Sequence, residues 1–229
     1  VYPDLNDWAN ALYVYSLVPY MGMNASGRSS DYLFMHTYAM GIWGNFLDQH
    51  IGGNELVMQT WEAGQSMSCQ YCLWMPDAIE SLGYDFDELY SQFIATNAVM
   101  DYSDQVYLQS PTLTDEVDSL PASGESDYRD RPQSLGQNFI RFERGLGGSD
   151  QALEVTFEGK DSPDYWVAVL VRGNFSVEEI VVFELDADGR GTARIDFDGE
   201  SYVHLVVSPV DEDAQGYYYN WENASDFDY

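Results

Sequence analysis

Two cysteines, Cys69 and Cys72 in the segment Ser-Cys-Gln-Tyr-Cys, are the residues whose spacing most directly suggests chemistry. A CxxC pair can form a disulfide, act in thiol redox exchange or supply two zinc ligands. Redox chemistry of the thioredoxin kind needs a strand-to-helix context, which this part of the sequence does not predict. A structural zinc site needs two further ligands, and the three histidines are not spaced near the pair or near one another. We therefore expect a local disulfide first, free thiols second, and metal or redox chemistry last.

The most suggestive carboxylate pair is Asp186 and Asp188, because Asp186-Ala187-Asp188-Gly189 begins like a calcium-binding EF-hand loop. The last position of such a loop supplies a bidentate glutamate, but in this sequence that position is Phe197. We therefore interpret the segment as a hairpin turn and keep Asp186 and Asp188 as candidate Ca²⁺ ligands. No other cofactor is predicted.

No catalytic residue is predicted. The sequence has no HExxH helix, Walker loop, GxGxxG turn or GxSxG elbow. His36 and His50 fall in or at the end of an apolar helix, where a structural role is the favoured interpretation, and His204 falls in a strand. A Cys-His or Ser-His-Asp site stays open, because such partners need not be close in the sequence, but no residue pattern selects one. Among 39 acidic residues, a carboxylate pair suited to glycoside hydrolysis carries almost no information. Glu62, which follows Trp61, is the acid closest to an expected cleft, and we interpret it as a solvated residue at a helix end.

The charge of the chain excludes whole classes of partner. The 229 residues include 39 acidic against 9 basic residues, a formal net charge of −30. Binding to a nucleic-acid backbone is excluded because too few cations are present to displace the counterions of phosphate. An anionic membrane surface is disfavoured for the same reason. The acidity either keeps an aromatic-rich protein in solution, with salt screening its self-repulsion, or includes Ca²⁺ sites.

Several features favour an extracellular protein. The chain has one lysine, Lys160, a CxxC pair, and three Asn-x-Ser sequons, which make Asn24, Asn174 and Asn223 candidate glycosylation sites. Neither a signal peptide nor a run of 18 apolar residues is present, so membrane insertion is not expected. If the protein is secreted, we expect the chain to be a mature fragment whose leader has been removed.

The first half of the sequence predicts helices. Over Asp31–Trp61 the apolar residues recur at helical spacing and cover nearly the whole circumference, with a break at His50–Gly53. Gly41 and Gly44 within this helix suggest close approach by another backbone. Further helices are expected over residues 7–17, 77–82 and 86–100, the last with a capping box that begins at Asp85. If nothing in the chain covers the apolar helix, we expect a second subunit to do so.

The second half predicts strands, because the apolar period changes to two. The fold class is therefore α+β, with an all-helical lobe over residues 1–103, a linker over 104–132 and a seven-stranded antiparallel β-sandwich over 133–229. The seven expected strands are 139–142, 153–157, 165–171, 180–185, 192–197, 202–207 and 217–221. The aromatic side chains of the last strand cannot all point inward, so we expect interface residues among Tyr217, Tyr218, Tyr219 and Trp221.

The order of several motifs resembles a known family. The motifs are Asp4-Leu5-Asn6-Asp7-Trp8, Tyr38-Ala39-Met40-Gly41-Ile42-Trp43, Trp61-Glu62, and Gly136-Gln137-Asn138-Phe139-Ile140-Arg141-Phe142. This order is similar to the part of certain proteins assigned as secreted bacterial zinc metalloproteases that follows their zinc-binding helix. The resemblance implies a helical lobe followed by a β-sandwich. The HExxH helix and the following ligand helix of that family are absent, so its metal ligands have no positions in this sequence.

These observations lead to one functional hypothesis and two alternatives. We expect a secreted, non-catalytic protein that acts by binding or by self-assembly, for example as a fibre or surface-layer subunit. Its partners would be other copies of itself or another extracellular protein. The alternatives are the C-terminal part of a zinc metalloprotease, without its active site, and a carbohydrate-binding module.

Overall fold

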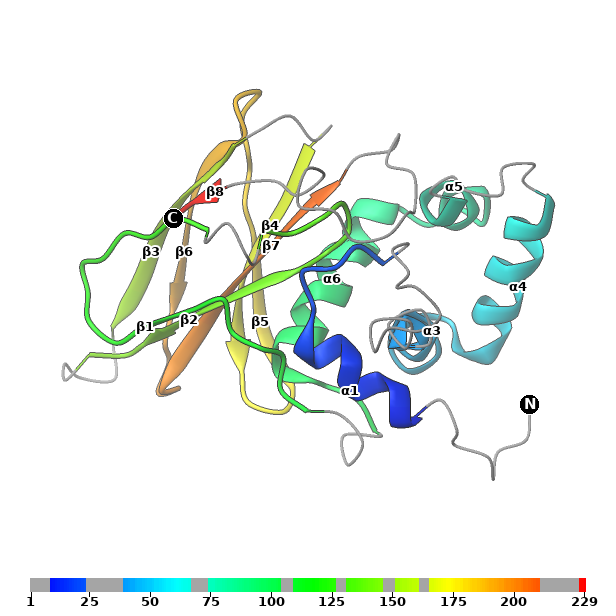
Figure 1. Cartoon of the computed structure of the whole chain (residues 1–229), viewed down its shortest axis with the longest axis horizontal. Coiled ribbons are helices and arrows are strands. Elements are labelled where there is room, and N and C mark those ends of the chain that lie inside the picture. Colours follow the sequence, from blue (N-terminus) through cyan, green and yellow to red (C-terminus); the bar gives the residue numbers. More distant parts are fainter. Residues whose placement is uncertain are drawn as a thin grey trace, which may run out of the picture.

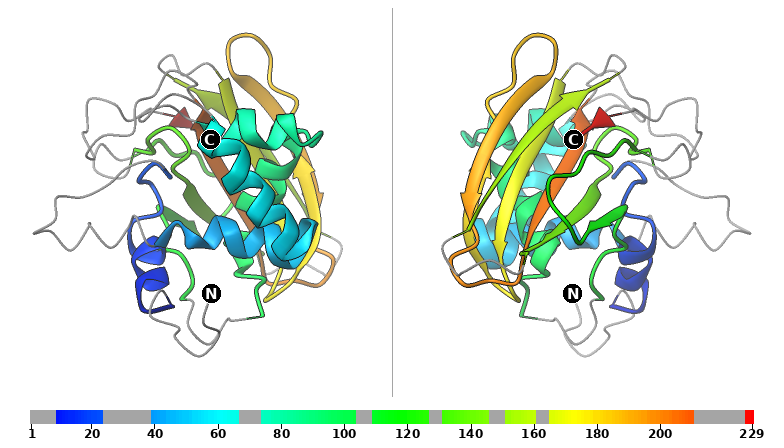
Figure 2. Two further views of the ribbon diagram at one scale, coloured as in Figure 1. Left: turned by 90° about the vertical axis from the view of Figure 1, so that its right-hand side faces the viewer. Right: turned by 90° about the vertical axis from the view of Figure 1, so that its left-hand side faces the viewer.

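The helices lie against one face of a five-stranded sheet, and a three-stranded sheet lies on the other face (Figure 1). This computed structural model describes residues 9–23, 39–66, 74–103, 109–126, 131–145, 151–160, 165–210 and 227–229. Figure 2 shows the helices in front of the strands from one side and the strands in front of the helices from the other. The described part of the chain is therefore α+β, with its layers in the order helices, five-stranded sheet, three-stranded sheet.

The helical layer contains five α-helices and one π-helical turn within the described residues. They are α1 (Ala9–Leu17), α3 (Gly41–Phe46), η2 (Leu47–Ile51), α4 (Gly53–Ser66), α5 (Trp74–Ser81) and α6 (Phe86–Val99). The predicted break before α4 is confirmed, since Gly53 has a φ of 69°, which glycine adopts readily. The predicted start of α6 is also confirmed, because the Asp85 side chain accepts a hydrogen bond from the backbone N–H of Glu88 at 3.0 Å.

The prediction that Gly41 and Gly44 allow close backbone approach is wrong for the described residues. A Cβ at Gly41 would meet no atom within 4 Å, and one at Gly44 would meet only a Val57 methyl group at 3.9 Å. Within the described part of the apolar segment, Trp43 is buried and packs edge-on against Phe93 of α6, with ring centroids 4.9 Å apart, whereas Trp61 is 63% exposed. The expected second subunit stays a prediction.

Eight strands form the two sheets of the described residues. They are β1 (Asp115–Val117), β2 (Asn138–Glu143), β3 (Ala152–Gly159), β4 (Tyr165–Gly173), β5 (Val177–Val182), β6 (Arg190–Asp196), β7 (Tyr202–Val210) and β8 (Phe227–Asp228). The larger sheet has the order β1-β2-β7-β4-β5 and the smaller sheet β6-β3-β8. Strands β2 to β7 confirm the first six strands predicted by the period of two. The predicted strand over 217–221 lies outside the described residues, so the seven-strand count stays a prediction.

The expectation of a wholly antiparallel arrangement is wrong, because β1 pairs with β2 in parallel. Strand β1 lies inside the segment predicted to be a linker. The chain leaves β1, forms a bridge between Glu125 and Asp228 at the smaller sheet, and then returns to enter β2 in the same direction as β1. Such a crossover permits parallel pairing. The sequence of β1, Asp-Glu-Val, is too short and too polar to show a strand period.

Two hydrophobic clusters lie on the two faces of the five-stranded sheet. The cluster on the helix side includes Phe139, Val169 and Val206 together with residues of α1, α3 and α6. The cluster between the sheets includes Leu170 and Leu205, which alternate with those residues along β4 and β7. The helices and the sheet thus share one core. The predicted boundaries at 103 and 132 stay a prediction.

Gly136 explains part of the motif that opens β2. A Cβ at this position would lie 2.1 Å from the backbone carbonyl oxygen of Tyr20, so any side chain would displace the backbone. The same two segments are joined by hydrogen bonds from Gln133 N to Tyr20 O at 2.9 Å and from Gln137 N to Pro19 O at 2.7 Å. The segment after α1 is therefore fixed to the entrance of β2.

A buried polar network fixes α6 on the sheet. The Gln137 Oε1 atom accepts from Asn97 Nδ2 at 3.1 Å and from the hydroxyl of Tyr15 at 2.5 Å, while Asn97 Oδ1 accepts from the hydroxyl of Tyr102. Asn97 and Gln137 are 0% exposed. Burial raises the pKa of the Tyr15 and Tyr102 hydroxyls well above the ordinary value, so both stay protonated donors. Unpaired polar groups at such depth are costly, so the network holds α6 in one register.

The network predicts a large effect of one substitution on α6. Asn97→Ala leaves the Tyr102 hydroxyl without its acceptor and Gln137 without one of its donors, so we expect the free energy of unfolding to fall by about 2–4 kcal/mol. Gln92→Ala, on the outer side of the same helix, is expected to change it by less than about 0.5 kcal/mol. Urea denaturation at neutral pH followed by tryptophan fluorescence measures both. Equal, small losses in the two variants would contradict the role of the network.

Candidate functional site

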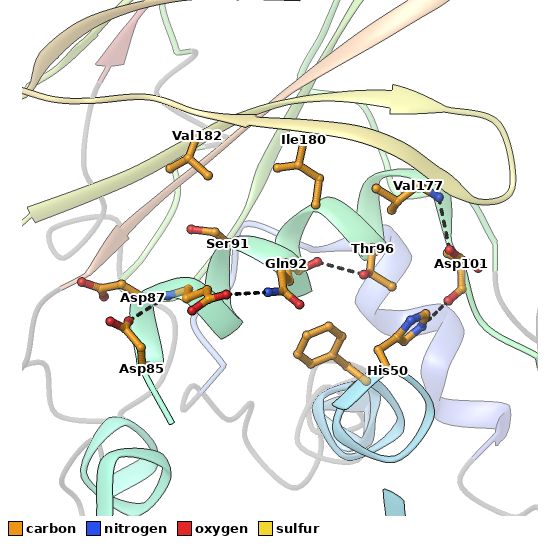
Figure 3. Close-up of a pocket in the computed structure, with 12 residues that line it drawn as sticks. His50, Asp85, Asp87, Ser91, Gln92, Thr96, Asp101, Val177, Ile180 and Val182 are labelled. Carbon is orange, nitrogen blue, oxygen red and sulfur yellow. Dashed lines mark hydrogen bonds between the residues drawn. The ribbon is translucent and has the colours of Figure 1, made fainter. Parts of the chain in front are cut away.

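A groove of about 780 Å³ lies between α6, η2 and the edge strand β5 (Figure 3). We call it the α6–β5 groove. Its floor is the outer face of α6, its apolar side comes from β5 and Phe46, and one end is closed by His50 and Asp101. The lining residues are Phe46, His50, Asp85, Asp87, Glu88, Ser91, Gln92, Thr96, Asp101, Val177, Ile180 and Val182.

The apolar wall of the groove belongs to β5. Val177, Ile180 and Val182 point from the strand toward α6 (Figure 3). Strand β5 is the last strand of its sheet among the described residues. The groove separates part of β5 from α6. Val182 is 51% exposed, and Val177 and Ile180 beside it are half-buried. The wall thus offers a ligand apolar surface at the open edge of the sheet.

The closed end of the groove is built on the π-helical turn η2. Gly52 N–H donates to Leu47 O at 3.0 Å, the five-residue spacing that defines a π-helix, and such turns are frequent at functional sites. The turn places the His50 ring against Phe46, with centroids 5.7 Å apart, and its Nε2 2.7 Å from the carbonyl oxygen of Asp101. Because a carbonyl can only accept, Nε2 carries the proton and donates.

Four carboxylates lie around the groove, and each has a structural partner. Asp85 caps α6, Asp87 Oδ1 accepts from the Tyr165 hydroxyl at 2.6 Å, and Glu88 accepts from Gln92 at 3.4 Å. Asp101 Oδ2 accepts from Val177 N–H at 3.1 Å and so ties the end of α6 to β5 (Figure 3). No described lining residue is lysine or arginine. The rim therefore carries negative charge that the groove itself does not compensate.

The lining of the groove combines apolar, hydroxyl and acidic side chains. Ser91 lines the groove, but no hydrogen bond joins it to His50 in the described structure, and such a bond marks an activated nucleophile. Among the described residues, no group of three or more His, Cys, Asp or Glu side chains could hold a metal ion. An aliphatic wall facing a rim of carboxylates is complementary to a cation that carries apolar groups.

The predicted calcium candidates lie away from the groove. Asp186 and Asp188 belong to the turn between β5 and β6. The turn that the sequence predicted is present, but β5 and β6 lie in different sheets, so the expected hairpin is not formed. The Asp186 Oδ1 atom accepts from the backbone N–H groups of Asp188 and Arg190, both at 2.9 Å. Arg190 in turn pairs with Glu158. Asp186 thus stabilises its own turn, and its binding of Ca²⁺ stays a prediction.

Other predicted site residues have mixed outcomes. Asn174 is exposed in the turn between β4 and β5, where its Oδ1 accepts from the Tyr202 hydroxyl at 3.2 Å. Glu62 is exposed on α4, as its interpretation as a solvated acid expected. Several candidates lie outside the described residues: Cys69, Cys72, Asn24, Asn223, Tyr217, Tyr218, Tyr219, Trp221 and His36.

Sequence reasoning missed the α6–β5 groove. Its parts come from positions 46–50, 85–101 and 177–182, which are far apart in the chain. One signal was present, since Val-Glu-Glu-Ile-Val-Val over β5 carries more aliphatic residues than a strand with a polar outer face requires. That signal identifies an apolar surface but not the helix opposite it.

Comparison with protein-family models finds no match, and comparison with curated proteins finds none either. The resemblance to zinc metalloproteases is therefore untested and stays a prediction. Among the helices that the structure describes, none combines the length and the apolar character that a membrane span requires.

His204, which the sequence placed in a strand, is buried on the helix-facing side of β7 and only 6% exposed. Its Nδ1 has no hydrogen-bond partner among the described residues. Burial, with a smaller contribution from the nearby Arg141 guanidinium, lowers the pKa of the imidazole to about 4. The side chain is therefore neutral at physiological pH.

The lowered pKa of His204 predicts a loss of stability in mild acid. The unfolded chain takes up a proton near pH 6.5, whereas the folded chain resists protonation until about pH 4. Unfolding is therefore favoured progressively as the pH falls from 6.5 to 4. Relative to His204→Leu, the natural protein should lose about 2 kcal/mol of unfolding free energy between pH 7.5 and pH 5. Urea denaturation of both proteins at the two pH values measures the difference. Parallel stability curves would contradict a neutral, buried His204.

Proposed function

We propose that this chain is a non-catalytic binding protein whose α6–β5 groove takes a basic peptide segment that also carries apolar side chains. The observation that carries the proposal is the opposition of Val177, Ile180 and Val182 to four rim carboxylates across one groove. Apolar side chains of the ligand would pack on β5. Its cationic groups would lie at Asp85, Asp87, Glu88 and Asp101.

The electrostatic support is both local and global. Each exposed charge pair contributes roughly 0.5 kcal/mol, so four rim carboxylates add about 2 kcal/mol to binding of a suitably spaced cationic segment. The formal charge of −30 attracts such a ligand over longer distances and increases its association rate at low salt. The same charges repel a second copy of this chain. The proposal therefore favours a basic partner over self-assembly.

The position of the groove supports a peptide as the ligand class. Among the described residues, no strand pairs with the outer edge of β5. Such an edge offers backbone donors and acceptors to an extended segment, while side-chain pockets beside it provide specificity. An extended peptide alternates its side chains between two faces, so apolar residues can enter the groove while lysines reach the rim.

We also propose an extracellular setting, in agreement with the sequons and the single lysine. Asn174, the candidate glycosylation site within the described residues, is exposed in a turn, where an attached sugar would be tolerated. Mass spectrometry of the protein from its natural source tests the location through the presence or absence of glycan at that site.

The binding proposal predicts which ligand features matter. An acetylated hexapeptide that alternates lysine and leucine is expected to bind, and its glutamate–leucine counterpart is not. Replacing leucine by serine should weaken binding by about tenfold, because burial of a leucine side chain contributes ~1.5 kcal/mol or more. Fluorescence anisotropy of labelled peptides at physiological salt measures the affinities.

Matched variants separate groove binding from general attraction by the net charge. The double variant Asp87→Asn, Glu88→Gln removes two rim charges and should weaken the lysine–leucine peptide about fivefold. The control Asp118→Asn, Glu154→Gln removes two exposed charges outside the groove and should change affinity by less than about twofold. Equal weakening by the two double variants, or no weakening by the serine peptide, would overturn the proposal.

A further inference from the structure

A second cavity, of about 530 Å³, lies at the C-terminal end of α6 and shares no lining residue with the α6–β5 groove. We call it the His204 pocket. It is formed where α6 ends and leaves the helix-facing surface of the sheet uncovered. The lining residues are Ala98, Val99, Met100, Ser110, Pro111, Leu113, Arg141, Asn174, Phe175, Tyr202 and His204.

Strand register places the polar residues of this pocket side by side. Glu116 of β1 pairs with Arg141 of β2, Arg141 pairs with His204 of β7, and His204 pairs with Val171 of β4. These residues form one row across the same face of the sheet. The row is apolar at Val171, which belongs to the helix-side core, and becomes polar where the helix ends. The pairing of β1, β2 and β7 therefore fixes the relative positions of Glu116, Arg141 and His204.

His204 is the observation that points to a ligand. The side chain is 6% exposed, lines the pocket, and its Nδ1 has no partner among the described residues. A buried polar atom without a partner costs about 1–3 kcal/mol, and in native structures such an atom calls for a bound water, an ion or another ligand group as its partner. A neutral imidazole offers one donor and one acceptor, which suits a hydroxyl group.

Two aromatic side chains lie at the same pocket. The Arg141 guanidinium carbon lies 5.4 Å from the centroid of the Tyr202 ring, and the centroid of the His204 ring lies 5.2 Å from it. The Tyr202 hydroxyl donates a hydrogen bond to Asn174 Oδ1. Phe175 is 69% exposed and has a φ of 69°, an uncommon conformation for a bulky residue. Backbone strain of this kind tends to be retained at binding sites.

The charges of the pocket do not favour an anion. The Arg141 Nη2 atom lies 2.7 Å from Glu116 Oε2 and 3.8 Å from Glu143 Oε1. Two carboxylates therefore already compensate the positive charge of Arg141. The remaining polar groups are the neutral His204, the Tyr202 hydroxyl, the Asn174 amide, the Ser110 hydroxyl and the Arg141 Nε–H, which has no partner among the described residues. The site therefore combines uncharged hydrogen-bonding groups with aromatic faces.

We propose that the His204 pocket binds a neutral saccharide unit. Its hydroxyl groups would exchange hydrogen bonds with His204 and Ser110, and its apolar C–H face would pack on Tyr202 or Phe175. The volume lies within the range typical of small-ligand sites. This site is independent of the peptide groove and would remain if that proposal failed.

Saturation-transfer NMR on the full chain, produced without N-glycosylation, tests the proposal. The probes are glucose, galactose, N-acetylglucosamine and cellobiose at millimolar concentration, with glucuronate as the anionic comparison. We expect transfer to at least one neutral sugar and none to glucuronate. Absence of transfer to every neutral sugar, or transfer to glucuronate alone, would overturn the proposal.

Variants locate the binding. Phe175→Asn removes the exposed ring, and asparagine tolerates a positive φ, so the turn should keep its shape. This variant and His204→Leu should each weaken sugar binding at least about fivefold, as expected for loss of a packing face or a hydrogen bond. Trp61→Ala removes an exposed aromatic residue of α4 and serves as the control. Equal binding by all three variants would place the sugar elsewhere and overturn the assignment. The lysine–leucine peptide should not compete with the sugar.

Discussion

The arrangement of this protein depends on the docking of α6 against the five-stranded sheet. Apolar packing alone would allow the helix to slide or rotate, but Asn97 must lie where it can donate to Gln137 and accept from Tyr102. A second buried pair joins the Tyr90 hydroxyl to Ser208 of β7 at 2.8 Å. Because buried polar groups are expensive to leave unpaired, these contacts specify one position of the helix on the sheet.

Both cavities follow from that position. On the side of β5, a groove separates α6 from the edge of the sheet. Ile180 and Val182 of β5 face the polar side of α6 across this groove. At its C-terminal end, Met100 takes a left-handed conformation with φ of 52° and ends the helix before it covers His204. The function proposed for each site is therefore tied to the register of one helix.

Much of the fold could be predicted from the sequence, because local signals specified it. Alternating residues such as those of Thr192–Phe197 identify strands, and Asp85 with Glu88 identifies the start of a helix. The parallel strand β1 could not be predicted, since Asp-Glu-Val carries no period and its partner β2 lies more than twenty residues away. The sites were missed for a related reason. His50 and Val177 both meet Asp101, and no local pattern connects three such distant positions.

Native-state hydrogen exchange tests the central claim most directly, namely that α6 and the sheet form one cooperative unit. The account predicts that the slowest amide protons of α6, β4 and β7 exchange with the same free energy of opening and the same dependence on urea, because all three contribute to one core. Exchange of the α6 amides through a lower-energy opening, with β4 and β7 still protected, would contradict it. In that case the helix would be a loosely attached cover, and neither cavity would have a fixed shape.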